Sequence, residues 1–394
     1  MENKIETINV GIFGHIDHGK TTLLEKLSGK WTDTHSEELK RGITIKLGYA
    51  DIIIYKQGSD YNTIKKGSPV RHVSFIDAPG HEMLMATTLS GAALIDIALL
   101  VIAANEGIKP QTRAHLMTLQ AKNVKNIIII QNKIDLVSKE QAEKNHEEII
   151  KFLPKELKNS QIIPVSAQQN VNIPEIYKAI AEFPYPERKP SLYPIFLIAR
   201  SFDINKPGTL PKNLHGAVLG GTLKQGTLKM GDEIEILPGK ISKQNEQKEY
   251  IPIKTKIRSL FKGSEKVQEL TPGGSMSIET ELDMSLGKSD SLSGNVLSLL
   301  RKLPKPATLV KLKNALFPEV FGLSGHVKPA PIKQGEVLML SINTSITGGT
   351  VSSINKDSLE ISLKIPVIGF KGDNVGIARN IQGHWRLIGY GEII

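Results

Sequence analysis

Short apolar segments alternate with longer amphipathic segments over the first half of the chain, from Ile8 to about Phe183. The apolar segments predict five strands, and the amphipathic segments predict three helices between them. The strands are Ile8–Phe13, His72–Ile76, Ile97–Ala103, Asn126–Ile130 and Gln161–Pro164, and the helices are Thr21–Leu27, Gln111–Lys122 and Lys139–Phe152. Two of the strands are apolar almost throughout, which is typical of strands buried on both faces of a parallel sheet. The pattern therefore predicts an α/β domain with a mostly parallel sheet.

The pattern changes after residue 183. The segment Phe183-Pro-Tyr-Pro-Glu-Arg-Lys-Pro190 is rich in proline, which predicts a stiff linker. Beyond it, short β-type segments are separated by regular glycine and proline turn signals, a pattern that favours β-barrels. A second break falls near Arg301-Lys-Leu-Pro-Lys-Pro306. We therefore predict three domains: the α/β domain at 1–184, followed by β-barrel domains at 185–300 and 301–394.

Composition narrows the class of protein. The 394 residues include no cysteine, which excludes disulfides and thiolate metal sites. The N-terminus is polar and acidic, unlike a signal peptide, and the apolar segments are far shorter than the ~20 residues that span a bilayer. We therefore expect a cytoplasmic protein with no membrane partner.

The net charge of +10 is distributed unevenly. Residues 1–184 carry 22 Lys and Arg against 21 Asp and Glu, and the remaining residues carry 28 against 19. The excess of +9 in the second half fits either an ordinary solvated surface or a surface that binds a polyanion such as a nucleic acid. Charge alone leaves both interpretations open.

A glycine-rich segment, Gly14-His-Ile-Asp-His-Gly-Lys-Thr21, lies between the first predicted strand and the first predicted helix. This is the context of a phosphate-binding P-loop, in which backbone N–H groups and the helix N-terminus attract the anion. Lys20 is expected to reach the β- and γ-phosphates, and the Thr21 hydroxyl is expected to bind Mg²⁺. The alternative is a glycine-rich turn without a ligand. The predicted nucleotide contacts in this loop are Asp17, His18, Gly19, Lys20, Thr21 and Thr22.

Three further segments follow later predicted strands. Asp77-Ala-Pro-Gly80 offers a carboxylate that can hold Mg²⁺ through water and an N–H for the γ-phosphate. Asn132-Lys-Ile-Asp135 offers a carboxylate to two N–H donors of guanine, a pair that adenine lacks. Ser166-Ala-Gln168 is a weaker motif in the position of a base-contacting loop. Because parallel sheets bind ligands at the carboxyl ends of their strands, these loops predict one guanine nucleotide site. Its further contacts are Asp77, Gly80, Asn132, Lys133, Asp135, Ser166, Ala167 and Gln168.

Two segments near this site resemble the switches of translational GTPases. Arg41-Gly-Ile-Thr44 resembles the first switch, in which Thr44 would bind Mg²⁺ and sense the γ-phosphate. Asp77-Ala-Pro-Gly-His81 resembles the second switch, and by that resemblance His81 is the catalytic residue that orients the attacking water. A lone histidine is more often a satisfied surface or core residue, but its position directly after Asp-x-x-Gly favours the catalytic role.

A closer resemblance is carried by four longer segments: Trp31–Asp51, Ala199–Gly208, Leu282–Gly294 and Trp385–Gly391. They resemble the gamma subunit of translation initiation factor 2 in its archaeal form. The resemblance implies a GTPase domain followed by two β-barrels, GTP/GDP and Mg²⁺ as ligands, and GTP hydrolysis. It implies a heterotrimer with alpha and beta subunits that carries methionylated initiator tRNA to the small ribosomal subunit. It also places Asp17 and the Gly42 carbonyl near a second Mg²⁺.

One segment departs from this family, whose members commonly carry a four-cysteine zinc knuckle between the two switches. Here residues 56–69 are polar and hold no thiolate, and His72 alone cannot make a zinc site. We therefore expect a polar loop and no zinc. Three other interpretations stay open from the sequence: a selenocysteine-specific elongation factor, the GTPase subunit of a sulfate-activating enzyme, and a GTP-dependent scaffold with negligible turnover.

Overall fold

The computed structural model describes residues 5–30, 47–81, 84–244, 247–320, 327–356 and 358–394. The chain divides into two compact units. One holds residues 1–186 with segments 317–329 and 381–388, and the other holds residues 187–316, 330–380 and 389–394. The predicted metal ligands Gly42 and Thr44 lie outside the described residues. Within the described ranges, no helix is long and apolar enough to cross a membrane.

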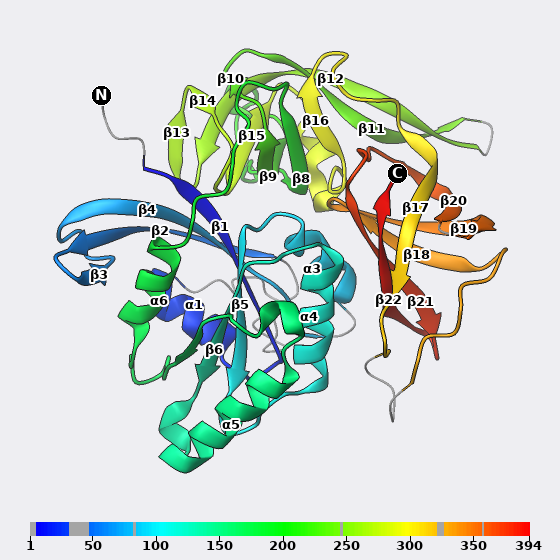
Figure 1. Ribbon diagram of the computed structural model, residues 1–394. Coiled ribbons are helices and arrows are strands. Elements are labelled where there is room, and N and C mark those ends of the chain that lie inside the picture. The colour runs from blue at the N-terminus through cyan, green and yellow to red at the C-terminus, as the bar shows by residue number, and fades with distance from the viewer. Residues whose placement is uncertain (1–4, 31–46, 82–83, 245–246, 321–326, 357) are drawn as a thin grey trace. The chain divides into compact units, whose positions relative to one another are not determined.

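The α/β domain is built on a seven-stranded sheet with the strand order β3-β2-β4-β1-β5-β6-β7 (Figure 1). The strands are β1 (Thr7–Gly14), β2 (Gly48–Gln57), β3 (Asp60–Asn62), β4 (Ser68–Asp77), β5 (Ile97–Ala103), β6 (Ile127–Asn132) and β7 (Ile162–Pro164). Strands β4, β1, β5, β6 and β7 run parallel, and β2 pairs antiparallel with β4 and β3. The carboxyl ends of the five parallel strands therefore lie together.

Helices cover both faces of this sheet (Figure 1). They are α1 (Lys20–Ser28), α3 (Met85–Ala92), α4 (Pro110–Ala121), α5 (Lys139–Phe152) and α6 (Ile173–Ala181), with short 3₁₀ turns η2 (Ile134–Leu136) and η3 (Lys155–Leu157). One core packs α1 and α6 against the sheet through Leu24 and Ile176. The other core packs α4 and α5 against the opposite face through Leu119 and Ile149. The predicted α/β architecture is confirmed, and the predicted strands and helices are present with small shifts at their ends.

The predicted polar loop at residues 56–69 is instead partly a β-hairpin, which corrects that prediction. Strands β2 and β3 pair antiparallel, and the Asn62 side chain closes the following turn by accepting hydrogen bonds from two backbone N–H groups at 3.2 and 3.3 Å. Tyr61 is buried, and its hydroxyl donates to Glu182 next to α6 at 3.0 Å. Hydrogen bonds and one aromatic ring thus hold the hairpin against the domain.

The second domain is a closed β-barrel. Its strands are β8 (Ile195–Phe202), β9 (Val218–Gln225), β11 (Glu233–Gln244), β12 (Gln247–Lys262), β15 (Met276–Thr280) and β16 (Val296–Leu299). They pair in the order β11-β16-β8-β9-β15-β12, and β11 pairs with β12 to close the barrel around Phe196, Leu219 and Ile278. The short elements β10 (Leu228–Lys229), β13 (Glu265–Val267), β14 (Glu269–Leu270), η4 (Pro211–Asn213) and η5 (Met284–Asp290) complete the domain.

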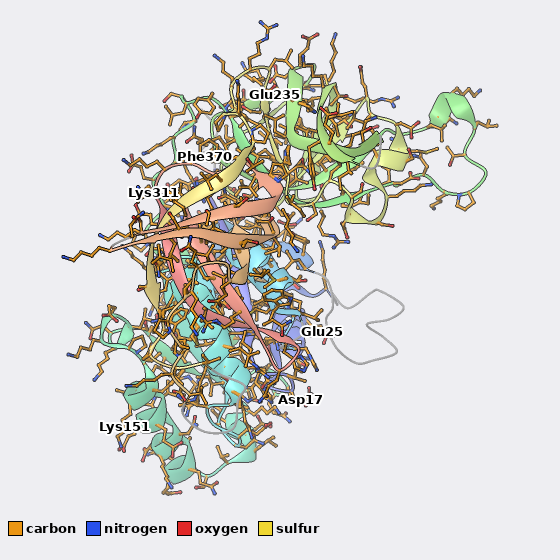
Figure 2. The ribbon with its side chains drawn as sticks, turned by 90° about the vertical axis from the view of Figure 1, so that its right-hand side faces the viewer. Asp17, Glu25, Lys151, Glu235, Lys311 and Phe370 are labelled. Carbon is orange, nitrogen blue, oxygen red and sulfur yellow. The ribbon has the colours of Figure 1, made fainter. Side chains whose placement is uncertain are left out.

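The third domain is a second closed barrel, with the strand order β17-β20-β19-β18-β21-β22. Its strands are β17 (Ala307–Leu316), β18 (Val337–Ile342), β19 (Ser345–Asn355), β20 (Ser358–Val367), β21 (Asn374–Ile381) and β22 (His384–Ile393). In β17, exposed Lys311 lies between buried Val310 and Leu312 (Figure 2), as expected of a strand with one face on the core. The two β-barrels that the sequence predicts are confirmed.

Candidate nucleotide-binding site

The P-loop connects the end of β1 to the start of α1. Gly14 has a φ of +142° and Gly19 a φ of +85°, and Asp17, exposed in the loop (Figure 2), also has a positive φ of +65°. A Cβ atom on Gly14 would lie 2.3 Å from the Val101 carbonyl oxygen of β5. Glycine at position 14 therefore lets the loop start directly against the sheet.

Lys20 and Gly80 lie next to each other, although 60 positions separate them. The Lys20 ammonium donates to the His15 carbonyl at 2.8 Å, so the side chain folds back over the P-loop. A Cβ atom on Gly80 would lie 2.6 Å from Lys20 Nζ and 3.2 Å from the Ile16 backbone nitrogen. The segment after β4 thus approaches the P-loop as closely as a glycine allows.

Thr21 and Asp77 bring two oxygen donors together below the P-loop. The Thr21 hydroxyl donates to Asp77 Oδ2 at 3.4 Å, and Asp77 is fully buried at the end of β4. Hydroxyl and carboxylate oxygens are the ligands that Mg²⁺ prefers. This donor set fits the Mg²⁺ that the sequence predicts.

Asn132, at the end of β6, connects three of the predicted loops. Its Nδ2 donates to the His18 carbonyl in the P-loop at 2.9 Å, and its Oδ1 accepts from the Ala167 N–H at 3.1 Å. The side chain is 2% exposed. The structure therefore brings the P-loop, the Asn132–Asp135 segment and the Ser166–Gln168 segment together at one end of the sheet.

The far end of this loop cluster is open to solvent. Asp135 lies in η2 and is exposed, as is Gln168. Lys133 has a φ of +62°, and its ammonium lies 3.3 Å from Glu106 in a salt bridge. Ser166 is buried and accepts a hydrogen bond from the Gln169 N–H within its own turn. Exposed carboxylate and amide groups here leave room for a base to enter.

Two P-loop histidines are held in the neutral form. His18 is fully buried, its Nδ1 donates to the Val101 carbonyl at 3.2 Å, and burial lowers its pKa to about 4. Burial also lowers the pKa of His15. At neutral pH the positive charge of the loop therefore comes from Lys20 and from the backbone N–H groups at the start of α1.

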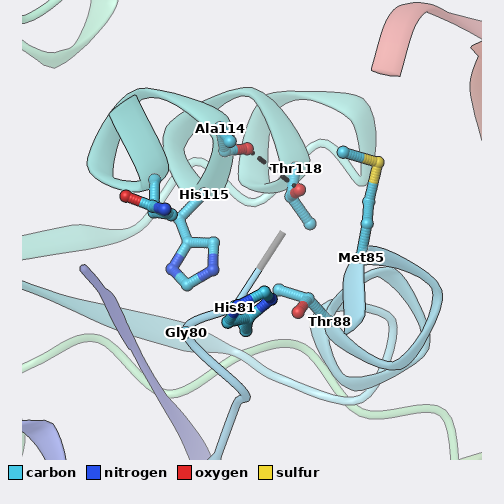
Figure 3. A pocket seen from close by; sticks show the side chains of 8 residues that line it. Gly80, His81, Met85, Thr88, Ala114, His115 and Thr118 are labelled. Atoms are coloured by element: carbon cyan, nitrogen blue, oxygen red, sulfur yellow. Dashed lines mark hydrogen bonds between the residues drawn. The ribbon is translucent and has the colours of Figure 1, made fainter. Parts of the chain in front are cut away.

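His81 borders a small cavity of about 10 Å³ between α3 and α4 (Figure 3). The other lining residues are Gly80, Met85, Thr88, Gln111, Ala114, His115 and Thr118. His115 is the residue near this site that the sequence does not reveal. It lies in the middle of α4, 101 positions from the P-loop glycine that it contacts, so no local pattern marks it.

Comparison with known proteins first identifies the class of protein. Residues 5–185 match the family described as Elongation factor Tu GTP binding domain, and residues 216–297 match Elongation factor Tu domain 2. A structure of a bacterial selenocysteine-specific elongation factor superposes with a TM-score of 0.76 at 26% identity and covers 98% of this chain; the chain spans 58% of that protein. Translation elongation factor SelB from Methanococcus maripaludis, in complex with a GTP analogue, superposes with a TM-score of 0.74 at 24% identity. The match covers 99% of this chain and 79% of that one. The fold and the site define a GTP-binding protein of the translational GTPase class.

The family follows from the full-length relatives. Residues 308–393 match the family described as Initiation factor eIF2 gamma, C terminal. Translation initiation factor 2 subunit gamma from Methanococcus vannielii is 48% identical over 98% of both chains. The corresponding subunit from Pyrococcus abyssi is 49% identical over 98% of this chain and 97% of its own length. The chain belongs to the family of translation initiation factor 2 gamma subunits. The selenocysteine-specific factors are more distant neighbours, which does not favour that alternative.

Proposed function

We propose that the protein binds and hydrolyses GTP as the gamma subunit of a cytoplasmic heterotrimeric initiation factor. With alpha and beta subunits, it carries methionylated initiator tRNA to the small ribosomal subunit. In this proposal the domain at 1–184 binds the nucleotide. The β-barrel domains at 185–300 and 301–394 contribute to tRNA binding. The identity of 48% over 98% of a chain named translation initiation factor 2 subunit gamma is the observation that carries the proposal.

The phosphates bind at the P-loop in this proposal. Gly19 and the start of α1, which includes Thr22, supply N–H donors, and Lys20 supplies the ammonium. Asp17 lies exposed within the loop. Thr21 and Asp77 supply oxygens to Mg²⁺. When bound, the ion neutralises part of the phosphate charge. Folding of Lys20 over the loop supports this assignment, because its ammonium is already near the Gly80 backbone.

The base binds at the open end of the loop cluster. Asp135 accepts from the two guanine N–H donors, and its exposure leaves the carboxylate accessible. Lys133 and the Ser166–Gln168 loop flank the base. Asn132 supports this site indirectly, because its two hydrogen bonds fix the base loop against the P-loop.

Hydrolysis depends on His81, which orients the attacking water next to the γ-phosphate. Gly80 offers its N–H to the same phosphate, and Thr44 of the first switch senses it. Contacts made only with the γ-phosphate order the two switches in the GTP state, and this ordering assembles the tRNA-binding surface. Asp17 and the Gly42 carbonyl would hold a second Mg²⁺ in this proposal. The +9 excess of charge after residue 184 agrees with binding of a polyanion such as tRNA.

The decisive experiment measures tRNA binding. The protein, mixed with its alpha subunit, should bind methionylated initiator tRNA at least tenfold more tightly with GTP than with GDP, and binding should weaken steeply with added salt. Elongator tRNA without a methionyl group is the control and should bind less tightly. Equal tRNA affinity with GTP, GDP and no nucleotide would refute the proposal. Stimulation of an adenylyltransferase would then support the sulfate-activation alternative.

A further inference from the structure

Helix α4 places a buried histidine between the P-loop and the segment that follows β4. His115 is 5% exposed, and its Nδ1 accepts a hydrogen bond from the Gly14 N–H at 2.7 Å. Its ring also packs edge-on against Phe13, with centroids 5.8 Å apart. The same ring borders the cavity that His81 also lines (Figure 3).

The hydrogen bonds of His115 define its tautomer. Because Nδ1 accepts from an N–H, the single ring proton of the neutral form is on Nε2. The ring also hydrogen-bonds to the Pro79 backbone. Proline has no N–H, so the partner is the Pro79 carbonyl and the ring is the donor. Thr88 Oγ1 donates to the same carbonyl at 3.2 Å. One imidazole therefore bridges Gly14 and Pro79.

This bridge requires a neutral ring. Burial, and to a smaller extent the nearby Lys20 charge, lower the pKa of His115 to about 3. A protonated ring would present an Nδ1–H to the Gly14 N–H, so two donors would face each other. At neutral pH the ring accepts at one end and donates at the other.

We propose that His115 is a positioning residue that couples the Pro79–Gly80 segment to the P-loop and so raises the preference of the site for GTP over GDP. The inference rests on the proposed nucleotide function. Gly80 directly follows Pro79 and lies so close to Lys20 that a Cβ atom at position 80 would be 2.6 Å from Lys20 Nζ. Displacing Gly80 from the γ-phosphate position requires breaking the Pro79 bond or moving Gly14. GDP has no γ-phosphate, so its binding is indifferent to where Gly80 lies.

Two conservative variants of the full-length protein separate the two ends of the bridge. In His115→Asn, the amide oxygen takes the place of Nδ1 and still accepts from Gly14, but the side chain is too short to reach Pro79. GDP affinity should stay within about twofold of wild type, and GTP affinity should fall about 3- to 10-fold, the effect of one buried hydrogen bond. In His115→Gln, the amide nitrogen takes the place of Nε2. Both affinities should fall together, because the Gly14 N–H loses its acceptor.

A matched control removes a buried hydrogen bond elsewhere in the same domain. Tyr177 donates to the Leu27 carbonyl at 3.0 Å, so Tyr177→Phe should lower the melting temperature while leaving the GTP/GDP affinity ratio unchanged. Titration with fluorescent GTP and GDP analogues and thermal melting of all four proteins are the measurements. An unchanged ratio in His115→Asn, with wild type binding both nucleotides, would refute the coupling alone. Failure of wild type to bind either nucleotide would refute the proposed function, and the coupling with it.

Discussion

Replacing Asn132 by Ala removes the side chain that joins the P-loop to the base loop. Asn132 is 2% exposed, and both of its hydrogen bonds end on backbone groups, the His18 carbonyl and the Ala167 N–H. Alanine can replace neither bond. The substitution therefore leaves one buried acceptor and one buried donor without this partner, and it releases two loops from each other.

The expected loss of unfolding free energy follows from these two hydrogen bonds. A buried hydrogen bond contributes about 0.5–1.5 kcal/mol net, and a buried group left unpaired costs about 1–3 kcal/mol, so the domain should lose about 2–4 kcal/mol of unfolding free energy. For a domain of this size, about 1 kcal/mol lowers Tm by about 2–4 °C, so Tm should fall by roughly 4–16 °C. GDP affinity should fall as well, because the phosphate and base contacts are no longer held in register.

Thermal melting and GDP titration of the purified protein measure both effects. Asn126→Ala is the matched control, since Asn126 directly precedes β6 and its side chain donates to the Asp96 carbonyl at 3.2 Å. The control should lose less than about 1 kcal/mol and keep its GDP affinity. If Asn132→Ala melts no earlier than Asn126→Ala and binds GDP equally well, the argument that Asn132 organises the site is wrong.

Four further outcomes are expected. Asp135→Asn should shift the base preference from guanine toward xanthine nucleotides, because an amide can donate to the 2-oxo group; competition titrations with XTP and GTP check this. His81→Ala should keep GTP affinity within about twofold but lower partner-stimulated single-turnover hydrolysis about 100-fold or more, as expected of a group that acts in the transition state. Elemental analysis after chelator washing should find no zinc, since no cysteine is present. His115 has a folded pKa of about 3, below its unfolded value of 6.5, so the stability from its neutral ring is present above pH 6.5 and is lost as the pH falls toward 3. The melting temperature of His115→Asn should therefore fall less between pH 7 and pH 5 than that of wild type.

The sequence was sufficient to predict the α/β architecture because its buried strands are short, apolar and separated by helices. The segment Ile97–Ala103 is uniformly apolar and is buried at every position. The P-loop, the Asp77–Gly80 segment and the Asn132–Asp135 segment also follow strands, so parallel pairing alone brings them to one end of the sheet. The two barrels were predictable from short β-type segments separated by regular glycine and proline turn signals.

Other features depend on contacts that no local pattern records. In β2, buried Ile52 and Ile54 alternate with half-buried Ile53. Because all three residues are isoleucine, the sequence does not show the alternation of apolar and polar residues that marks a strand. The hairpin at residues 56–62 gains its order from Tyr61 and Glu182, which are 121 positions apart. His115 lies 101 positions from Gly14. Propensity describes a residue and its neighbours, whereas these features result from tertiary packing.

The closed barrels also affect how separate molecules interact. A long open strand offers unpaired N–H and C=O groups on which another chain can pair. At the described open edges, β3, β7 and β13 each have three residues, and β10 and β14 each have two. In addition, β7 ends in Pro164, which has no N–H to donate. Protection of this kind comes from backbone geometry and not from repulsion between molecules of charge +10. It should therefore persist at high salt, where charge repulsion is screened.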